Sequence, residues 1–311
     1  MKCKVCKRRA VINLRAQNRG LCESCFDAYV LDRVELTIKR YKMFSRGQRI
    51  LVAVSGGKDS LGLWDILARL GYEPAGLFVD MGITRGNYSA RSREVVESFA
   101  QSRGLELVVE SLEAWWGRSI EKIGRRVLCP TCGMAKRYLT NRVAADRGYD
   151  VLCTGHNLDD EAAVLLSNLL NWQVGYLARQ APVLDSWHPR LARKAKPLVL
   201  LTEKESALYT LLRGIEYVEE PCPYSRGATT LRYKRVLNQV EWRSPGTKQR
   251  FYTLFLKNKG LFEGVAKEER EGFKECKRCG QPTWEGLCAF CRFMEESHGD
   301  FGREVSKGDQ V

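Results

Sequence analysis

The spacing of its twelve cysteines constrains this 311-residue chain more than any other feature. Eight of the cysteines form two CxxC…CxxC sets at the chain ends, namely Cys3, Cys6, Cys22 and Cys25, and Cys276, Cys279, Cys288 and Cys291. Paired CxxC knuckles at such spacings are typical of tetrahedral zinc sites closed by four thiolates. We therefore predict two zinc ribbons, over residues 1–27 and 261–297, with a structural role and RNA docking as a secondary role.

Three further cysteines form an incomplete set in the middle of the chain. Cys129 and Cys132 are a CxxC pair at the expected start of a helix, where thiolates are favoured, and Cys222 follows between two prolines. Three cysteines leave a metal centre with one open position, which suits chemistry better than structure. The residues alone leave open an iron–sulfur cluster, a redox or persulfide pair, and three unconnected buried thiols. Cys153, inside an expected strand, is predicted to be a small buried hydrophobe.

Composition and charge restrict the class of protein. There is no apolar run of 18 residues and the first nine residues are rich in lysine and arginine, so we expect neither a membrane span nor a signal peptide. Cysteine pairs without an export signal favour metal ligation in a reducing cytoplasm. The net charge of +14 is concentrated, with 13 Lys/Arg against 4 Asp/Glu in residues 1–50 and 9 against 1 in residues 226–260. These stretches fit either a polyanionic partner or a basic solvated surface.

The apolar pattern between the ribbons alternates between two periods. Short β-branched runs predict strands at residues 49–54, 75–79, 105–109 and 151–154. Helical spacing predicts helices at residues 28–47, 61–70, 89–103, 132–147 and 158–170. This alternation predicts an α/β fold with a parallel, doubly wound sheet in a body over residues 28–260. We expect mainly helices after residue 202, a loop at 219–228 and a disordered tail at 298–311.

Two segments at strand ends carry the signature of a phosphate site. Residues 55–60, with the sequence SGGKDS, join the first strand to a helix, where paired glycines and free N–H groups favour phosphate. The spacing is not that of a Walker loop. A second string, TGHNLDDEA at residues 154–162, follows the fourth strand, at the edge where parallel sheets bind ligands. Taken alone, Asn157 and Asp159 are better explained as helix caps.

Together these motifs mark a resemblance. SGGKDS resembles the PP-loop of the ATP-pyrophosphatases, which split ATP into AMP and pyrophosphate, and TGHNxDDEA resembles the second motif of their tRNA-thiolating members. A CxxC pair with a distant cysteine, between two terminal ribbons, resembles the two-zinc-finger tRNA 2-thiouridine synthetases. In that family the three cysteines hold a 4Fe-4S cluster with one iron free of protein ligand. The resemblance covers residues 1 to about 293 and implies the same fold and activity.

The resemblance also implies roles for individual residues. It implies that ATP with Mg²⁺ is bound by Ala53, Ser55, Gly56, Gly57, Lys58, Asp59, Ser60, Val79, Lys136, Gly155 and Asp160. It implies catalytic roles for Cys129, Cys132, Cys222, Lys136 and Asp160.

The resemblance implies partners as well. They are a tRNA, a sulfur donor that in the family is often a ubiquitin-like protein with a C-terminal thiocarboxylate, and a second copy of the chain. Either the T-loop or the wobble uridine fits as target. The alternatives are thiolation through a cysteine persulfide, a PP-loop ligase that transfers no sulfur, and an RNA-binding protein with a degenerate nucleotide fold.

Overall fold

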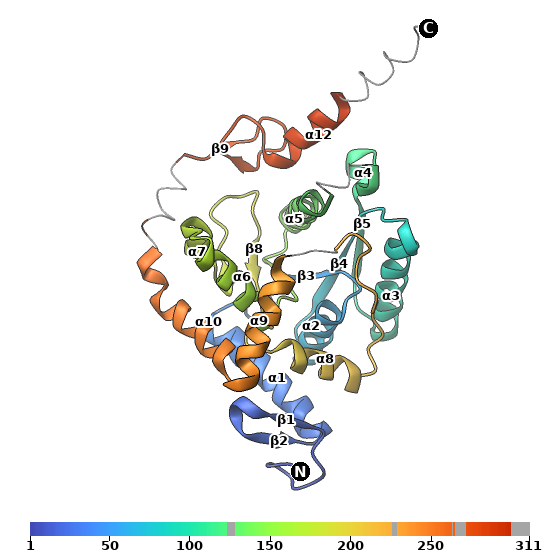
Figure 1. The fold of residues 1–311 in the computed structure, drawn as a ribbon. Coiled ribbons are helices and arrows are strands. Elements are labelled where there is room, and N and C mark those ends of the chain that lie inside the picture. The colour runs from blue at the N-terminus through green and yellow to red at the C-terminus, as the bar shows by residue number, and fades with distance from the viewer. Residues whose placement is uncertain (123–127, 226–228, 263, 265–271, 300–311) are drawn as a thin grey trace, which may run out of the picture.

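A computed structural model describes residues 1–122, 128–225, 229–262, 264 and 272–299 of the chain (Figure 1). Its centre is a six-stranded sheet of order β5-β4-β3-β6-β8-β7, in which all neighbours are parallel except β7 and β8. The strands are β3 (Ile50–Val54), β4 (Pro74–Asp80), β5 (Leu107–Ser111), β6 (Val151–Thr154), β7 (Val183–Leu184) and β8 (Arg193–Ala195). The predicted α/β fold with a mostly parallel sheet is confirmed. From β3 the chain adds β4 and β5 on one side of the sheet and then β6 on the other. The carboxyl ends of β3 and β6 therefore form the switch point where such sheets bind ligands.

Helices cover both faces of this sheet, and the alternation of side chains along β3 shows which helices face which side. Ile50, Val52 and Val54 belong to a core shared with α1 (Glu23–Arg40), α2 (Lys58–Arg69), α3 (Tyr88–Arg103), α6 (Leu158–Leu170) and α8 (Glu203–Leu212). Leu51 belongs to a second core with α4 (Leu112–Trp116) and α5 (Leu128–Asp146). This period of two is the expected pleat of a strand buried on both faces.

The two cysteine-rich units lie at opposite ends of the molecule (Figure 1). The N-terminal unit is a hairpin of β1 (Ile12–Leu14) and β2 (Arg19–Leu21) that runs into α1. The C-terminal unit pairs β9 (Lys274–Glu275) with β10 (Pro282–Thr283) and continues as α12 (Ala289–Gly299). It packs on α5, where the ring of Phe290 stacks on that of Tyr138 at 4.1 Å. Each unit is therefore joined to the body by apolar packing.

Three further helices pack on α6. They are α7 (Val174–Arg179), α9 (Thr229–Arg243) and α10 (Thr247–Asn258). Helix α9 packs on α6 and α10, and Figure 1 shows it standing in front of the sheet. It therefore connects the switch point with the N-terminal unit.

Several predicted boundaries need correction. The first helix begins at residue 23, because Cys22 is its N-cap in extended conformation, and it ends at residue 40 rather than 47. Helix α2 begins at Lys58, inside the SGGKDS motif, and not at residue 61. The strands β7 and β8 were not predicted, and α12 extends to residue 299, two residues into the predicted tail. The rest of that tail lies outside the described residues.

Candidate active site

The SGGKDS segment forms a tight turn between β3 and α2. Ser60 closes the turn, since its hydroxyl donates to the carbonyl of Gly57 at 2.9 Å and accepts from the N–H of Ser55 at 3.1 Å. Gly56 has a φ of +80°, and a Cβ there would lie 3.1 Å from the carbonyl oxygen of Ser92. Only glycine meets both demands. The turn thus points its backbone N–H groups out of the first turn of α2.

The TGHNLDDEA segment lies directly against this turn. A Cβ at Gly155 would stand 2.9 Å from the carbonyl group of Asp59, so the two segments touch backbone to backbone. Asn157 caps α6, because its side chain accepts from the N–H groups of Asp159 and Asp160. The Asn157 amide also donates to Asp59 at 3.3 Å. Asn157 is therefore both a helix cap and a link between the two motifs.

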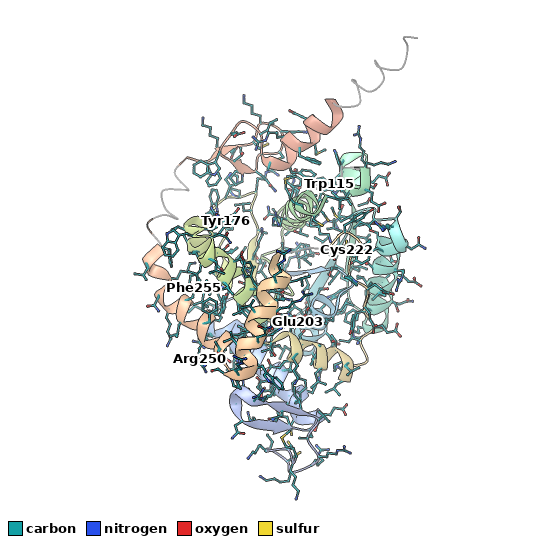
Figure 2. All side chains as sticks on the ribbon, viewed as in Figure 1. Trp115, Tyr176, Glu203, Cys222, Arg250 and Phe255 are labelled. Carbon is teal, nitrogen blue, oxygen red and sulfur yellow. The ribbon has the colours of Figure 1, made fainter. Side chains whose placement is uncertain are left out.

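Two lysines and three carboxylates form an ion-pair network at the same place. The ammonium of Lys58 lies 3.0 Å from Asp59 and 3.2 Å from Glu203, and that of Lys234 lies 2.6 Å from Asp160 and 3.1 Å from Glu203. Figure 2 labels Glu203, the first residue of α8, where it bridges the two lysines. Burial alone would lower the pKa of Lys234, but attraction to Asp160 and Glu203 outweighs it and raises the pKa to about 12. The same lysines hold the pKa of Glu203 below its usual range against the effect of burial.

A cavity of about 180 Å³ opens at the carboxyl ends of β3 and β4. Four residues that the sequence assigned to ATP line it, namely Ala53, Ser55, Val79 and Lys136. The other lining residues include Phe78, which precedes Val79 on β4, and Thr154 of the TGHNLDDEA segment, together with Met81, Tyr88, Ser92 and Arg137, which the sequence analysis did not single out. Within the described part of the chain, the buried hydroxyl of Ser92 has no hydrogen-bond partner. The cavity therefore combines apolar walls with unsatisfied polar and cationic groups, as expected of a nucleotide site.

The three central cysteines come together beside this cavity. Cys129 and Cys132 lie in the first turns of α5, and the thiol of Cys129 donates to the carbonyl of Tyr224 at 2.8 Å, which brings the loop with Cys222 onto the helix. Cys132 and Cys222 pack against the same core, and Figure 2 labels Cys222. Burial raises the pKa of Cys132 and outweighs the opposing effect of the Lys136 ammonium, while the nearby Cys222 and Cys129 raise it further. Cys153 is fully buried in β6, as predicted.

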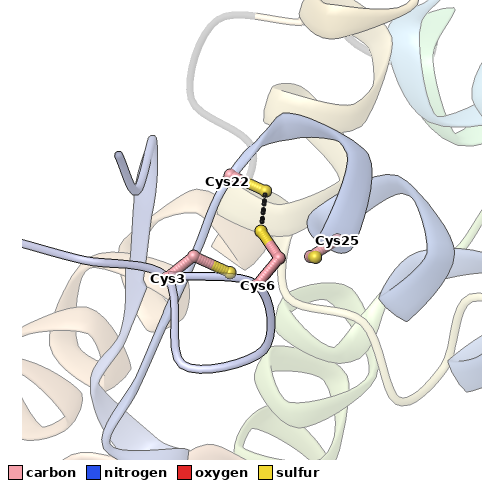
Figure 3. Close-up of side chains that lie close together, drawn as sticks. All are labelled: Cys3, Cys6, Cys22 and Cys25. Carbon is pink, nitrogen blue, oxygen red and sulfur yellow. Dashed lines mark hydrogen bonds between the residues drawn. The ribbon is translucent and has the colours of Figure 1, made fainter. Parts of the chain in front are cut away.

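The terminal cysteines form two much tighter groups. In each set of four, Cys3–Cys6–Cys22–Cys25 and Cys276–Cys279–Cys288–Cys291, all four sulfurs lie within 4.8 Å of one another. Figure 3 shows the N-terminal set. Among the described residues, these are the two groups of that kind; the three central cysteines do not form one. A backbone N–H from Cys6 contributes most to lowering the pKa of Cys3 to about 6. The predicted pair of four-cysteine clusters is confirmed.

Comparison with protein-family models and known proteins identifies the chain. A PP-loop domain model matches residues 31–229, and a model for the N-terminal LIM domain of the 2-thiouridine synthetase TtuA matches residues 2–27. The tRNA-5-methyluridine(54) 2-sulfurtransferases of Thermus thermophilus and Thermotoga maritima are 47% and 45% identical to this chain. Each alignment covers 95% of it, and 91% and 97% of the relatives. This chain belongs to the PP-loop tRNA 2-sulfurtransferases. It is thus a transferase of the ATP-pyrophosphatase type, and the resemblance stated from its motifs is confirmed.

A solved structure extends the likeness of this sulfurtransferase to the whole fold. The U34-tRNA thiolase NcsA of Methanococcus maripaludis, solved with its 4Fe-4S cluster, superposes with a TM-score of 0.82 and 25% identity. The superposition covers 95% of this chain and 96% of the thiolase. No helix in the described ranges of the sulfurtransferase combines the length and apolar character needed to cross a membrane.

Sequence reasoning missed the residues that complete the ion-pair network. Glu203 and Lys234 are far in sequence from Asp160, and only the excess of basic residues in 226–260 signalled that this segment has a charged partner. Lys248 was missed as well; its ammonium is buried and pairs with Asp159, and it donates to Asn238 at 2.8 Å. Pairs that depend on helix packing leave no local pattern in the sequence.

Proposed function

We propose that this sulfurtransferase uses ATP to replace the C2 oxygen of a tRNA uridine by sulfur, giving 2-thiouridine. The observation that carries the proposal is the convergence of two chemistries at one sheet edge. The SGGKDS turn and the TGHNLDDEA segment meet in backbone contact, and the cavity beside them is lined by Lys136, one helical turn after Cys132. A phosphate site adjacent to three thiols is what activation by ATP followed by attack of sulfur requires.

We infer that ATP places its phosphates on the N–H groups of residues 55–60, at the start of α2. Its adenine ring then lies in the cavity between Ala53 and Val79, whose apolar walls suit a base. Asp59 and Asp160 offer the carboxylate oxygens that Mg²⁺ prefers. Lys136, which lines the cavity, offsets the charge that develops on the α-phosphate in the transition state.

The chemistry that these residues support has two steps. The uridine O2 attacks the α-phosphorus of ATP, a new P–O bond forms, and pyrophosphate leaves. Adenylation turns O2 into part of a good leaving group, so that sulfur can attack C2, form the C–S bond and expel AMP. In this scheme Glu203 and Lys234 keep Asp160 in one orientation through the ion pairs described above.

The sulfur centre is proposed to be a 4Fe-4S cluster held by Cys129, Cys132 and Cys222. The residues fit such a group, since a cluster takes each thiolate on a different iron and needs wider spacing than a single ion. When bound, the cluster would supply an iron without protein ligand at which sulfur is held. Transfer through a persulfide on one of the three thiols, without a cluster, is the alternative that the same geometry allows.

The terminal groups are proposed to hold one Zn²⁺ each. Four thiolates around one tetrahedral zinc have sulfurs about 3.8 Å apart, given a Zn–S bond of about 2.3 Å. The distance between the sulfurs of Cys6 and Cys22 is 3.3 Å and that between Cys279 and Cys288 is 3.7 Å, close to this value. Both groups are closed by four ligands, which fits structure rather than catalysis.

The target is proposed to be the uridine at position 54 of tRNA. Three relatives that are 44–47% identical to this chain are named for that position, whereas the thiolase named for position 34 is 25% identical.

The partners that follow from the resemblance are a ubiquitin-like sulfur donor with a C-terminal thiocarboxylate and a second copy of the chain. Twelve free thiols are in keeping with a cytoplasmic location.

Nucleoside mass spectrometry tests the proposal. Anaerobically purified protein is incubated with ATP, Mg²⁺, sulfide and one of three unmodified tRNA transcripts: the parent, one with position 54 changed to cytidine, and one with position 34 changed. We expect 2-thiouridine from the parent and from the position-34 variant, with none from the position-54 variant. Thiolation that is lost instead with position 34 would overturn the assignment of the target. An ATP-dependent product that contains no sulfur would identify a PP-loop ligase.

A further inference from the structure

Helix α9 carries different residues on its two faces. On the inner face, Lys234 contacts Asp160 and Glu203, and the buried Leu237 packs on α6. On the outer face, Arg232, Arg235, Gln239 and Arg243 follow one another at spacings of three, four and four residues, which aligns them in one row along the helix. All four side chains are exposed. We call this row the α9 ridge.

The arginines of the α9 ridge carry uncompensated charge. Within the described part of the chain, the side chains of Arg232, Arg235 and Arg243 make neither a hydrogen bond nor an ion pair. Several arginines elsewhere are paired with carboxylates, as Arg69 is with Asp27 at 2.6 Å and Arg103 with Asp65 at 2.8 Å. Arginines kept free of carboxylates are available to bind a partner's anions.

The acidic residue nearest to these arginines in sequence does not neutralise them. Glu241 is the one carboxylate in α9, and it accepts from the backbone N–H groups of Gly246 and Lys248 at 2.5 Å and 2.8 Å. Its charge is therefore directed towards the start of α10, on the inner side of the helix. A guanidinium row of this kind matches phosphate groups, which it can bind with two parallel hydrogen bonds each.

The ends of α9 give the ridge a direction. At its C-terminal end, the guanidinium of Arg15 from the N-terminal hairpin lies 4.7 Å from the ring centre of Trp242, which is 73% exposed. An exposed indole of this kind is a platform on which a nucleobase can stack. At its N-terminal end, α9 follows the segment that carries Cys222, and Figure 1 shows the helix in front of the sheet that holds the cavity. A polyanion along the ridge would thus run from the N-terminal ribbon towards the three cysteines.

We propose that the α9 ridge is the surface that binds the phosphate backbone of the tRNA and leads its target loop to the active site. The inference rests on the proposed function, and it deepens it by naming where the RNA lies. Charge complementarity selects RNA over a second copy of the chain, because the ridge has no carboxylate to pair with that copy's basic residues. Lys234 belongs to the same helix as the ridge. RNA bound on the outer face of α9 is therefore coupled to the ion pair that Lys234 makes with Asp160 on the inner face.

A triple variant with Arg232→Gln, Arg235→Gln and Arg243→Gln tests the proposal. A charge-matched control replaces three other exposed cations by glutamine. They are Lys39 on α1, Lys42 just after α1, and Arg93 on α3. The measurement is fluorescence anisotropy of labelled tRNA over a range of salt concentrations, with thiolation kinetics in parallel. At about 0.1 M salt we expect the triple variant to bind at least roughly tenfold more weakly, with a salt slope about two to three units smaller. KM for tRNA should rise while kcat is kept, and the control should stay within about twofold of the parent.

Other outcomes overturn the proposal. If the triple variant binds tRNA with the parent's affinity and salt slope, the phosphate backbone lies elsewhere. If its RNA affinity is unchanged but sedimentation shows that a dimer has become a monomer, the ridge is an interface between two copies. A parent protein that binds tRNA through the ridge and yet transfers no sulfur would refute the proposed function while leaving this surface intact.

Discussion

The terminal cysteine groups and the central cysteines differ in how the chain builds them. Each terminal group comes from one short segment, is complete with four ligands, and gathers its sulfurs within 4.8 Å. The central set joins two thiols of a helix to Cys222, 90 residues later, and the fold is needed to bring them together. A local, closed site can form early and stabilise its own unit, as structural zinc sites do. A set of three thiols that only the fold brings together, with one position left open, fits the proposed role in sulfur transfer.

Replacing Cys222 by alanine should have the largest effect on activity. We expect thiolation to fall by about a thousandfold or more, because this position has no substitute ligand. The melting temperature should change little, since Cys222 is only partly buried. Cys153→Ala is the matched control, because that thiol is buried away from both kinds of site. Equal loss of activity in both variants would show that Cys222 has no role in the reaction beyond that of an ordinary buried cysteine.

Replacing Lys234 by methionine should lower kcat by roughly a hundredfold, because Asp160, in the catalytic role proposed for it, loses its positioning partner. Asp160 and Glu203 lose their shared ammonium, while the apolar stem of the side chain is kept. Single-turnover assays at saturating ATP and tRNA measure this effect. Lys234→Arg should recover part of the rate, because a charge returns to the same place. Unchanged kcat with raised KM for ATP would assign Lys234 to substrate binding instead.

Replacing Cys22 by alanine should act on stability first. We expect one zinc per chain to be lost and unfolding to become easier by about 2–5 kcal/mol, since ligands of a structural site contribute to folding directly. Phe26 and Val30 of α1, which follow this site, are buried in the main core, so loss of order should stay confined to the N-terminal unit. Zinc analysis and limited proteolysis report both effects. Loss of the iron proposed at the central cysteines along with that zinc would show that the two sites are not independent.

The smallest effect concerns the pH dependence of the Glu203 bridge. The pKa of Glu203 is lowered in the folded protein, so its ion pairs stabilise the fold above the ordinary glutamate pKa near 4.5 and the gain is lost as pH falls below it. Because the side chain is 38% exposed, this gain is about 1 kcal/mol or less. Urea unfolding of Glu203→Gln and parent should differ most above pH 5 and converge towards pH 3. If the difference in unfolding free energy between the two proteins grew on acidification, the ion pairs of Glu203 would not be stabilising in the way proposed here.

Much of the fold could be predicted from local patterns. The four buried parallel strands are short apolar runs that end in glycine, polar or charged residues, and their boundaries agree with the structure within two residues. Strands β7 and β8 escaped prediction because they hold two and three residues, and β8 reads Arg-Lys-Ala. Strand β8 pairs with β6, and β7 pairs with β8, so both depend on the sheet that is already present.

The parts of the site that are contiguous in sequence could likewise be predicted, and the parts that depend on helix packing could not. The SGGKDS and TGHNLDDEA segments are contiguous, so the sequence located them, and each lies where a strand ends. The lysines that neutralise their carboxylates come from helices packed against α6, and Lys234 and Lys248 look like any other cations of a basic segment. Which of two similar lysines faces inward is decided by the rotation of α9 and α10 on the core, and no local pattern records it.

Metal analysis of anaerobically purified protein tests the contrast between the two kinds of site most directly. Iron, acid-labile sulfide and zinc are measured per chain in the parent and in Cys129→Ala, Cys132→Ala and Cys222→Ala. The account predicts about four irons and two zincs in the parent, with the iron lost and the zinc kept in each variant. Two zincs without iron, even after anaerobic reconstitution, would contradict the cluster and leave a persulfide mechanism or another PP-loop reaction in its place.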